Sequence, residues 1–448
     1  CLDLAVWVDA VICDYNYVFD PNVYLKRFFG EGTSGEYIFL IDEAHNLVDR
    51  GREMYSAYVD RADVLEAKKL AVDYSKGLVR ALEKVNRQLR TLEKECTEYE
   101  ILPNPGAVSL GMLQVMGEMD KLLEELHGKE LPEQLLEFYF CVRDFLNIDE
   151  LLDENYVVYT EMGEGGKVIL RLFCVNPAAN IHRCLEKGKS AVFFSATLLP
   201  MDYYRALLST RKDDYGIYVT SPFRQENRCI LTGRDVSSRY TRRGYEEYRK
   251  IAEYIARMSW QKKGNYMVFF PSYKLMDDVW QVYQEEFSSG WVRCICQHAS
   301  MTEREREEFL EEFTEESADT LVGFCVMGGI FSEGIDLIGN RLIGAAVIGT
   351  GLPQVSCERE ILKEYYDAKG EQGFDYAYRY PGMNKVLQAA GRVIRTRKDR
   401  GTILLMDERF TGRDYRMLFP REWNDAAVCI LENVEQQLGA FWKMEEKK

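Results

Sequence analysis

The sequence predicts an α/β fold of parallel sheets that carries a helical insertion, and three observations support this prediction. Short apolar runs of the kind found in buried strands alternate with helical patterns at both ends of the 448-residue chain. Several of these runs are continuously apolar and rich in Val, Ile and Phe, as strands covered on both faces of a parallel sheet are. Between residues 56 and 165 the pattern changes to apolar residues at helical spacing, which predicts amphipathic helices.

The individual elements follow from these patterns in chain order. The expected strands are Ala10–Asp14, Tyr37–Asp42, Val168–Val175, Ala191–Ser195, Tyr266–Phe270, Thr320–Val326, Leu342–Ile348 and Thr402–Asp407. In the middle segment, one apolar stripe runs from Leu78 to Leu92 and a second begins at Met112, with steps of three and four residues. Both stripes predict helices that pack one face into a core.

Composition and charge limit the classes of function. The chain is 46% hydrophobic and 29% charged, which is typical of a globular protein. Its net charge is −16, so a nucleic-acid partner must be held by local basic patches. The charge-free apolar run at residues 342–355 is shorter than the roughly 20 residues of a membrane span, so no membrane partner is expected. The 12 cysteines are scattered without a Cys-x-x-Cys, as expected of reduced thiols in a cytoplasmic protein.

Two adjacent carboxylates, Asp42 and Glu43, follow the apolar run Tyr37–Ile41. This is the Walker B arrangement, in which a strand end presents an aspartate to Mg²⁺ through water and the next glutamate polarises a water for attack on a γ-phosphate. The carboxyl edge of a parallel sheet is also where open α/β folds bind ligands. The alternative is an ordinary helix start, where the helix dipole favours acidic residues.

A second polar group lies near the other end of the chain. If residues 388–395 form a helix, Gln388, Arg392 and Arg395 share one face at i, i+4 and i+7. Two guanidiniums and an amide that converge on one point suit a phosphate whose charge rises in the transition state. A solvated basic face is the equally weighted alternative, because Arg397 and Lys398 follow directly.

Two further loops follow expected strands. Ser195, Ala196 and Thr197 come after an apolar strand, and a glycine loop that ends in Asp336 follows Thr320–Val326. The glycines allow a ligand to approach the backbone closely, and Asp336 can accept a hydrogen bond. Each loop taken singly is also compatible with ordinary turn chemistry.

Together and in this order, the motifs resemble those of superfamily 2 DNA helicases of the XPD/DinG iron–sulphur class. In chain order they are Asp14-Tyr15-Asn16-Tyr17, Asp42-Glu43-Ala44-His45, Ser195-Ala196-Thr197, Phe270-Pro271-Ser272-Tyr273, Glu333-Gly334-Ile335-Asp336 and Gln388-Ala389-Ala390-Gly391-Arg392-Val393-Ile394-Arg395. The resemblance covers essentially the whole chain. It implies two RecA-like domains, the first incomplete and interrupted by an Arch-like helical insertion. The implied domains are 1–55 and 166–225 for the first RecA-like domain, 56–165 for the insertion and 226–448 for the second RecA-like domain.

The resemblance also implies a role for each motif residue. Asp42 would hold Mg²⁺ through water and Glu43 would be the catalytic base. His45, also in the catalytic set, would couple the nucleotide site to the inter-domain cleft. The other implied assignments are catalysis for Gln388, Arg392 and Arg395, ATP binding for Gly334, Asp336 and Gly391, coupling for Ser195, Ala196 and Thr197, and DNA binding for Tyr15, Asn16, Tyr17, Ser272, Tyr273 and Glu333.

Two features depart from the family pattern. The sequence has no Gly-x-x-x-x-Gly-Lys-[Ser/Thr] loop, which cradles phosphates with its backbone N–H groups. Gly188-Lys189-Ser190 has Arg183 in place of the first glycine and precedes its strand, so it is interpreted as a turn. The family's four cluster cysteines would also lie upstream. The chain is therefore expected to be the carboxyl-terminal portion of a longer protein, inactive alone and without an iron–sulphur cluster of its own.

The implied function is ATP-dependent DNA unwinding by the parent protein. Its ligands would be ATP and Mg²⁺, with a 4Fe–4S cluster in the parent only, and its partners single-stranded and forked DNA; a monomer is expected. The alternative is a nucleic-acid- or partner-binding module without ATPase activity. A metal hydrolase built on Asp42, Glu43 and His45 is disfavoured, because the i, i+4 histidine pair that chelates zinc from a helix is missing.

Overall fold

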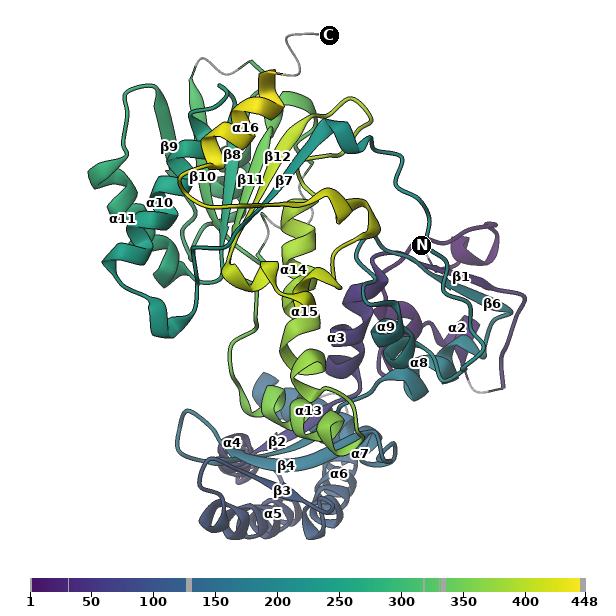
Figure 1. Ribbon diagram of the computed structural model, residues 1–448. Helices are drawn as coiled ribbons and strands as arrows, with labels where there is room; N and C mark the ends of the chain where they lie inside the picture. The colour runs from purple at the N-terminus through teal and green to yellow at the C-terminus, as the bar shows by residue number, and fades with distance from the viewer. Residues whose placement is uncertain are drawn as a thin grey trace. The chain divides into compact units, whose positions relative to one another are not determined.

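The computed structural model describes residues 2–30, 32–125, 131–316, 319–329, 331 and 336–443. The chain divides into two compact units (Figure 1). The first unit comprises Cys1–Tyr215 and Ser356–Lys369, and the second comprises Gly216–Val355 and Gly370–Lys448. Each unit has its own sheets and its own hydrophobic core.

A seven-stranded sheet forms the centre of the second unit, in the order β13-β7-β12-β11-β8-β10-β9. Every neighbouring pair of strands is parallel. The strands are β7 Arg228–Gly233, β8 Asn265–Phe270, β9 Val292–Cys296, β10 Thr320–Val326, β11 Gly344–Ile348, β12 Gly401–Met406 and β13 Ala427–Cys429. Strands β8, β11 and β12 are buried at every residue, which explains their continuous apolar runs.

The helices of the second unit cover this sheet. They are α10 Tyr245–Ser259, α11 Tyr273–Glu286, α12 Glu303–Glu311, α14 Tyr380–Ala390, α15 Arg413–Arg416 and α16 Val434–Lys443. Helices α10, α11 and α16 bury their apolar stripes against one face of the sheet, where Val268 and Phe270 of β8 belong to the same core. The expected strands in this unit, Tyr266–Phe270, Thr320–Val326, Leu342–Ile348 and Thr402–Asp407, are confirmed to within two residues at each end.

The first unit contains a parallel pair of strands, β1 Ile38–Ile41 and β6 Ser190–Phe193. The helices of this part are α1 Asn16–Phe19, α2 Lys26–Phe29, α3 Ala44–Met54, α8 Ala178–Leu185 and α9 Met201–Leu208. Helix α13 Cys357–Ala368 lies near the four-stranded sheet described next (Figure 1), with Glu358 3.9 Å from Arg171. Burial alternates along β1: Phe39 and Ile41 are buried, whereas Ile38 and Leu40 are 64% and 69% exposed. One face of this two-stranded sheet is therefore apolar and uncovered within the described chain.

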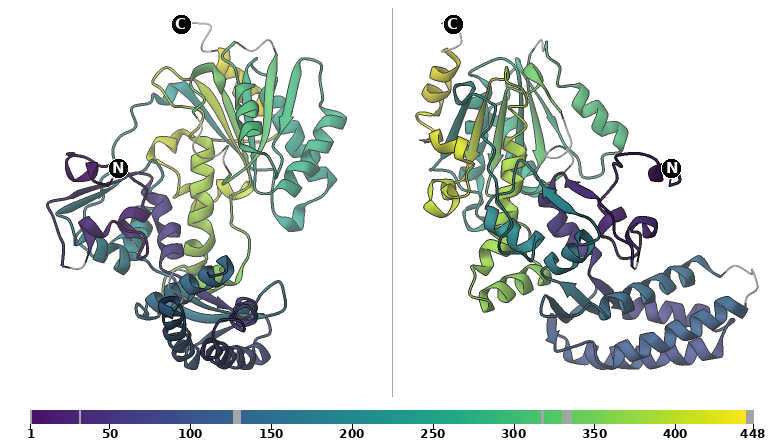
Figure 2. Two further views of the ribbon diagram at one scale, coloured as in Figure 1. Left: turned by 180° about the vertical axis from the view of Figure 1, so that it is seen from behind. Right: turned by 90° about the vertical axis from the view of Figure 1, so that its right-hand side faces the viewer.

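A four-stranded antiparallel sheet with helices makes up the rest of the first unit. The strands, in the order β2-β5-β4-β3, are β2 Ala57–Asp60, β5 Val168–Cys174, β4 Tyr156–Met162 and β3 Tyr99–Leu102. The helices are α4 Arg61–Ala71, α5 Lys76–Glu95, α6 Ala107–Glu125 and α7 Glu133–Asp149, which form a helical bundle (Figure 2, right). The apolar stripes of α5 and α6 are buried in one core, as the periodicity predicts.

Three expectations about elements are wrong. Ala10–Asp14 is not a strand; its residues are exposed and pair with no strand, so the short apolar run lacked the partner that a strand needs. Val168–Val175 is a strand, β5, but it lies antiparallel between β2 and β4 rather than in a parallel sheet. Residues 56–165 are not purely helical, because they contain β2, β3 and β4.

The antiparallel sheet also crosses the boundary expected at residue 166, since β5 pairs with β4. Helix α13 was expected in the second RecA-like domain, but it belongs to the first unit. Its Arg359 reaches Asp49 of α3 at 3.9 Å, and Tyr365 donates a 2.9 Å hydrogen bond to the Glu154 carbonyl. Contacts of this kind between segments far apart in sequence leave no local sequence signal.

Candidate active site

The two motifs of the first unit meet at one edge of the β1–β6 pair. Ile41 is in register with Phe193, so the residues that follow the two parallel strands emerge side by side. The Ala44 backbone N–H donates a 3.1 Å hydrogen bond to the Phe194 carbonyl, which ties the start of α3 to the second loop. The carboxyl edge of this sheet is thus where the acidic and hydroxyl motifs come together, as expected for a ligand site in an α/β fold.

The side chains at this edge form one hydrogen-bonded network. Ser195 Oγ donates to Glu43 Oε2 at 3.1 Å and lies 2.8 Å from His45 Nδ1. His45 Nδ1 is also 3.3 Å from the same carboxylate oxygen, and the imidazole is buried. The Thr197 N–H donates to Ser195 Oγ at 3.2 Å, and the two hydroxyls lie 3.4 Å apart. A hydroxyl 152 residues away in the chain therefore helps to hold the Glu43 carboxylate.

Glu43 has an unusual backbone. Its φ of 45° and ψ of 43° lie in the left-handed region, and among the described residues it is the non-glycine with positive φ. Such a conformation costs a non-glycine residue roughly 1–2 kcal/mol. A 2.7 Å hydrogen bond from the Glu43 N–H to Asp42 Oδ1 helps to hold it. Strain of this kind concentrates at functional sites, so it supports a functional role for the turn.

Tyr15 is bound to the same turn. Its hydroxyl donates to the carbonyls of Asp42 and of Glu43, the second at 3.0 Å. Burial, followed by the charges of Glu43, Asp42 and Asp14, raises the pKa of Tyr15 to about 12, because each disfavours the phenolate. The structure thus gives Tyr15, whose predicted role was DNA binding, a contact with the acidic turn. Asn16 begins α1 and Tyr17 is exposed on that helix, so DNA binding by these residues stays a prediction.

The acidic turn fits a Mg²⁺ ion that is bound mainly by water and by a nucleotide. Magnesium sites of this kind use one or two carboxylates, with waters and phosphates as the other ligands. Asp42 is exposed, and its Oδ1 accepts a hydrogen bond from the Glu43 N–H. No group of three or more His, Cys, Asp or Glu side chains in the described ranges is arranged as a metal cluster.

In the second unit, a buried glutamine links the predicted Ser272-Tyr273 loop to its neighbours. Ser272 caps α11 by accepting from the Leu275 N–H at 3.3 Å. Gln297, directly after β9, donates to the Tyr273 hydroxyl at 2.9 Å and accepts from the Val326 N–H at 2.8 Å. The carboxyl ends of β8, β9 and β10 are therefore joined by one side chain.

The arginine motif is not a continuous helix, which corrects the sequence-based prediction. Helix α14 contains Gln388 but ends at Ala390, with Gly391 as its C-cap. Arg392 lies in the following turn and Arg395 three residues further on. The buried Asp399 carboxylate competes with helical hydrogen bonding after Ala390. Its Oδ2 accepts from the N–H groups of Arg395 at 2.7 Å and of Thr396 at 2.6 Å.

The same turn brings two predicted motifs together. Arg395 forms a 2.7 Å ion pair with Asp336, the last residue of the glycine loop that follows β10. Glu333 and Gly334 of that loop lie outside the described residues. Gly328, earlier in the loop, has a φ of 72°, so it uses the conformational freedom of glycine beside Lys385 of α14.

Sequence reasoning missed Gln297 and Asp399 as organising residues. A polar residue directly after the apolar run of β9 was the available signal for Gln297. For Asp399, the signal was a carboxylate four residues after Arg395 in a basic segment. Neither signal is specific without the structure, because both also occur at ordinary strand ends and turns. Ala196 is exposed between Ser195 and Thr197, and no contact of its side chain bears on its predicted coupling role.

The comparisons with known families agree with this organisation. Residues 255–426 match the family model described as Helicase C-terminal domain, and residues 4–64 match the family described as DEAD_2. The first match covers most of the parallel sheet of the second unit, and the second covers the acidic turn. None of the helices in the described ranges is both long and apolar enough to cross a membrane.

Curated relatives and solved structures point the same way. The chain is 24% identical over 420 residues to the ATP-dependent DNA helicase XPD of Sulfolobus acidocaldarius, covering 90% of this chain and 70% of that protein. It is 30% identical over 276 residues to a regulator of telomere elongation helicase 1 homolog of Drosophila ananassae, which is 55% of this chain but 27% of that protein. In fold it is similar to the S. tokodaii Xpd4 structure, with a TM-score of 0.61, 16% identity and coverage of 93% and 81% of the two chains.

A large parallel sheet, an acidic strand-end turn and the matches to the two family models together support a superfamily 2 helicase. Within that superfamily, these matches support the XPD/DinG type. A structure titled XPD_Helicase, with a TM-score of 0.57, 19% identity and coverage of 93% and 72%, has the same mixed α/β fold with RecA-like domains.

Proposed function

We propose that the protein is an ATP-dependent DNA helicase in which this chain supplies the catalytic base and the γ-phosphate arginines. The observation that carries the proposal is the network that joins Glu43, His45 and Ser195 at one sheet edge. Because the chain spans 70% of the Sulfolobus relative and 27% of the Drosophila one, the activity belongs to the whole protein. Both relatives are named as helicases, which supports the same activity.

In the proposed mechanism, Glu43 accepts a proton from the water that attacks the γ-phosphate. Its carboxylate is oriented for this task by the Ser195 hydroxyl, and its backbone by Asp42 and Tyr15. Asp42 would hold Mg²⁺ through water; a bound Mg²⁺ supplies positive charge that offsets the charge of the β- and γ-phosphates. His45 and Thr197 contact Ser195, so a movement of the Ser195 loop would change the position of Glu43.

The second unit would supply cationic groups for the transferred phosphate. The proposed groups are Arg392 and Arg395, with Gln388 on the preceding helix. The ion pair with Asp336 pre-orients the Arg395 guanidinium, and a planar guanidinium can donate two hydrogen bonds to one phosphate. Gly391 and Asp336 would line the ATP site. Glu333 and Gly334 keep their predicted roles, DNA binding and ATP binding, as part of this proposal.

The remaining assignments are also proposals. ATP and Mg²⁺ are the proposed ligands, single-stranded and forked DNA the proposed substrates, and a cytoplasmic monomer the proposed state. DNA binding by Tyr15, Asn16, Tyr17, Ser272 and Tyr273 stays a prediction. A 4Fe–4S cluster would belong to the whole protein.

A nucleic-acid- or partner-binding module without ATPase activity is the second candidate. It is favoured by one observation: the 448 residues contain no Gly-x-x-x-x-Gly-Lys-[Ser/Thr] sequence, and backbone N–H groups of such a loop hold the phosphates in this class of enzyme. Acidic and arginine side chains cannot replace that row of donors, because positioning supplies much of the rate in phosphoryl transfer.

The test is Glu43→Gln in the whole protein, which keeps the shape of the side chain and removes the basic oxygen. We expect DNA-stimulated ATP hydrolysis to fall about 100-fold or more while nucleotide binding changes little. Glu53→Gln is the matched control, because Glu53 is exposed near the far end of the helix that follows Glu43 and pairs with Arg50. Hydrolysis within twofold of wild type in Glu43→Gln would exclude the base assignment, and no hydrolysis by the wild-type protein would favour the binding module.

A further inference from the structure

The first connection between the two units runs from the end of α9, at Leu208, to the start of β7, at Arg228 (teal in Figure 1). Its first part is open to solvent, because residues 210–217 are all exposed. The hydrogen bonds described for this part are local, such as those that join Ser209 to Asp214 and to the Arg211 N–H. No described hydrogen bond ties residues 210–217 to the body of either unit.

From Tyr218 onward the linker is attached to the second unit. Tyr218 is half-buried, whereas its apolar neighbours Ile217 and Val219 are 75% and 80% exposed. The Tyr218 hydroxyl donates a hydrogen bond to Glu422 Oε2, and the Arg421 guanidinium lies 4.5 Å from the centroid of the Tyr218 ring. The linker is therefore attached here through one polar side chain and not through packing of its apolar residues.

Glu422 is the common acceptor for this second part of the linker. Its Oε1 accepts from the Ser221 N–H at 3.3 Å. Its backbone carbonyl accepts from Gln225 Nε2 at 3.4 Å and from the guanidinium of Arg228. Together with the Tyr218 hydroxyl, four donors of the linker and of the first residue of β7 converge on one residue about 200 positions further along the chain.

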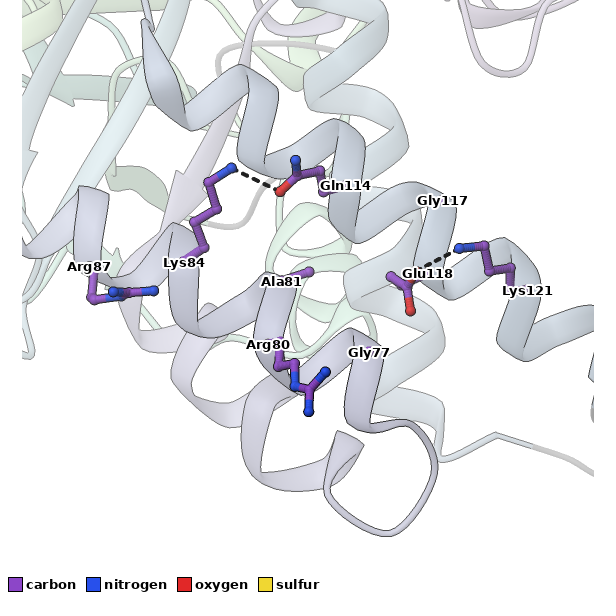
Figure 3. Close-up of a pocket in the computed structure, with 9 residues that line it drawn as sticks. All are labelled: Gly77, Arg80, Ala81, Lys84, Arg87, Gln114, Gly117, Glu118 and Lys121. Atoms are coloured by element: carbon purple, nitrogen blue, oxygen red, sulfur yellow. Dashed lines mark hydrogen bonds and ion pairs between the residues drawn. The ribbon is translucent and has the colours of Figure 1, made fainter.

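Several donors on one acceptor differ from an ordinary surface pair. In Figure 3, Lys84 donates to Gln114, and Lys121 pairs with Glu118, so each pair joins one donor to one acceptor. Isolated exposed pairs contribute little to stability, because each of them must order two long side chains. Glu422 is ordered once and serves four donors, so the contacts support one another.

Glu422 belongs to a well-packed part of the second unit. It lies in the 3-10 helix η7 Arg421–Asp425, whose Trp423 is buried. The Trp423 ring packs edge-on against Phe419, with 5.4 Å between the ring centroids, and Phe419 lies 6.3 Å from the fully buried Phe410. A linker that is bound to Glu422 is therefore fixed to the core of the second unit.

We propose that the Glu422 carboxylate is a latch that holds residues 218–224 to the second unit and confines the hinge of this connection to residues 209–217. At roughly 3.4 Å per residue, residues 209–217 extend over about 30 Å at most, and residues 209–224 over about 55 Å. Release of the latch would therefore nearly double the reach of this connection. The inference concerns the linker and does not rest on ATP hydrolysis.

Two exposed arginines of the linker allow an internal comparison by limited trypsin digestion. Arg211 lies in the hinge and Arg224 in the latched part. The contacts of Ser221 and Gln225 flank Arg224, so trypsin can cleave after Arg224 only when this segment detaches. The rate of cleavage then follows the population of the detached state. In the folded wild-type chain, we expect cleavage after Arg211 to be at least about 10-fold faster than after Arg224, measured by mass spectrometry at short digestion times.

Glu422→Ala removes the carboxylate and leaves the backbone carbonyl in place. We expect it to make cleavage after Arg224 at least about 10-fold faster and to change cleavage after Arg211 less than twofold. Tyr218→Phe removes a single hydroxyl and should accelerate cleavage after Arg224 about threefold. Asp425→Ala is the matched control, because Asp425 is an exposed carboxylate of the same 3-10 helix, and it should leave both rates unchanged.

Hydrogen–deuterium exchange separates release of the latch from unfolding. In Glu422→Ala, exchange should rise in residues 218–224 and stay at the wild-type level in β12. If it rises in β12 as well, Tyr218→Phe decides, because the loss of one hydroxyl at a half-buried position leaves the core intact. An unchanged rate of cleavage after Arg224 in Tyr218→Phe would then overturn the proposal. Equally fast cleavage after Arg211 and Arg224 in the wild-type chain would also overturn it, because residues 218–224 would not be held.

Discussion

Ser195 offers the sharpest test of the network at the acidic turn. Its hydroxyl lies 2.8 Å from His45 Nδ1, donates to Glu43 Oε2 at 3.1 Å and accepts from the Thr197 N–H at 3.2 Å. Ser195→Ala removes all three interactions and adds no bulk. A hydrogen bond to a charged group contributes about 1.5–3 kcal/mol, and about 1.4 kcal/mol corresponds to a factor of ten in rate.

If the Glu43 carboxylate is correctly placed only when Ser195 holds it, this energy appears in the chemical step. We therefore expect Ser195→Ala to lower kcat for DNA-stimulated ATP hydrolysis about 10- to 100-fold in the whole protein, with KM for ATP changed less than threefold. Phosphate release under steady-state conditions measures both constants. Ser195→Thr keeps the hydroxyl and should recover most of the rate, which a simple packing role would not explain.

The matched control is Ser190→Ala, at the exposed start of the strand that precedes Ser195, which should retain wild-type kcat. Thermal unfolding of each variant separates misfolding from misplacement, since a correctly folded Ser195→Ala protein should lose only a few degrees. A kcat within twofold of wild type in Ser195→Ala would refute the reasoning. The contact would then be structural, and Glu43 would be oriented by its backbone alone.

Three further outcomes follow from the structure. Arg395→Lys should reduce ATP hydrolysis at least 10-fold, nearly as much as Arg395→Ala, because an ammonium cannot reproduce the planar guanidinium; steady-state phosphate release measures this. Tyr15→Phe should flatten the alkaline loss of stability, measured by urea unfolding between pH 9 and 12. Burial and the Glu43 charge raise the pKa of Tyr15 from 10 to about 12. The contribution of the Tyr15 hydroxyl to the free energy of unfolding is therefore complete below pH 10 and falls as the pH rises toward 12. Leu40→Asn with Val192→Thr should lower binding of anilinonaphthalene sulphonate and light scattering, because these neighbouring residues are 69% and 50% exposed on one apolar sheet face.

For each of these three predictions, one result would contradict the reasoning. Retention of most of the ATPase rate in Arg395→Lys, with DNA binding unchanged, would indicate that its pair with Asp336 is only a surface contact. For Tyr15→Phe, the same alkaline slope as in wild type would mean that the hydroxyl contributes nothing to stability. Dye binding that persists after the Leu40 and Val192 changes would locate the exposed apolar surface elsewhere. Leu47→Asn, at a fully buried position, is the control that should unfold the first unit.

Local patterns in the sequence were sufficient to predict most of the elements. Continuous apolar runs gave β8, β10, β11 and β12 because a strand that is covered on both faces needs apolar residues at every position. The stripes of α5 and α6 were predicted for a similar reason, since 3.6 residues per turn align every third or fourth residue. The acidic turn was found because carboxylates after a buried strand are a local signal.

The features of the fold that the sequence did not predict depend on contacts between segments that are distant in the chain. The antiparallel setting of β5, the grouping of α13 with the first unit and the contact of Tyr15 with the acidic turn all involve partners far away in the chain. Periodicity shows whether a strand is buried, but it does not identify the neighbouring strand. The end of α14 at Ala390 was missed because Asp399, outside the predicted helix, competes for the backbone N–H groups.

The sequence by itself marked the candidate residues for chemistry, and the tertiary structure decided which of them touch. Asp42, Glu43 and Ser195 are recognisable from their places after apolar runs, since such runs mark strand ends. Their contact arises only because β1 and β6 are parallel neighbours in register, which brings two loops about 150 residues apart to the same edge.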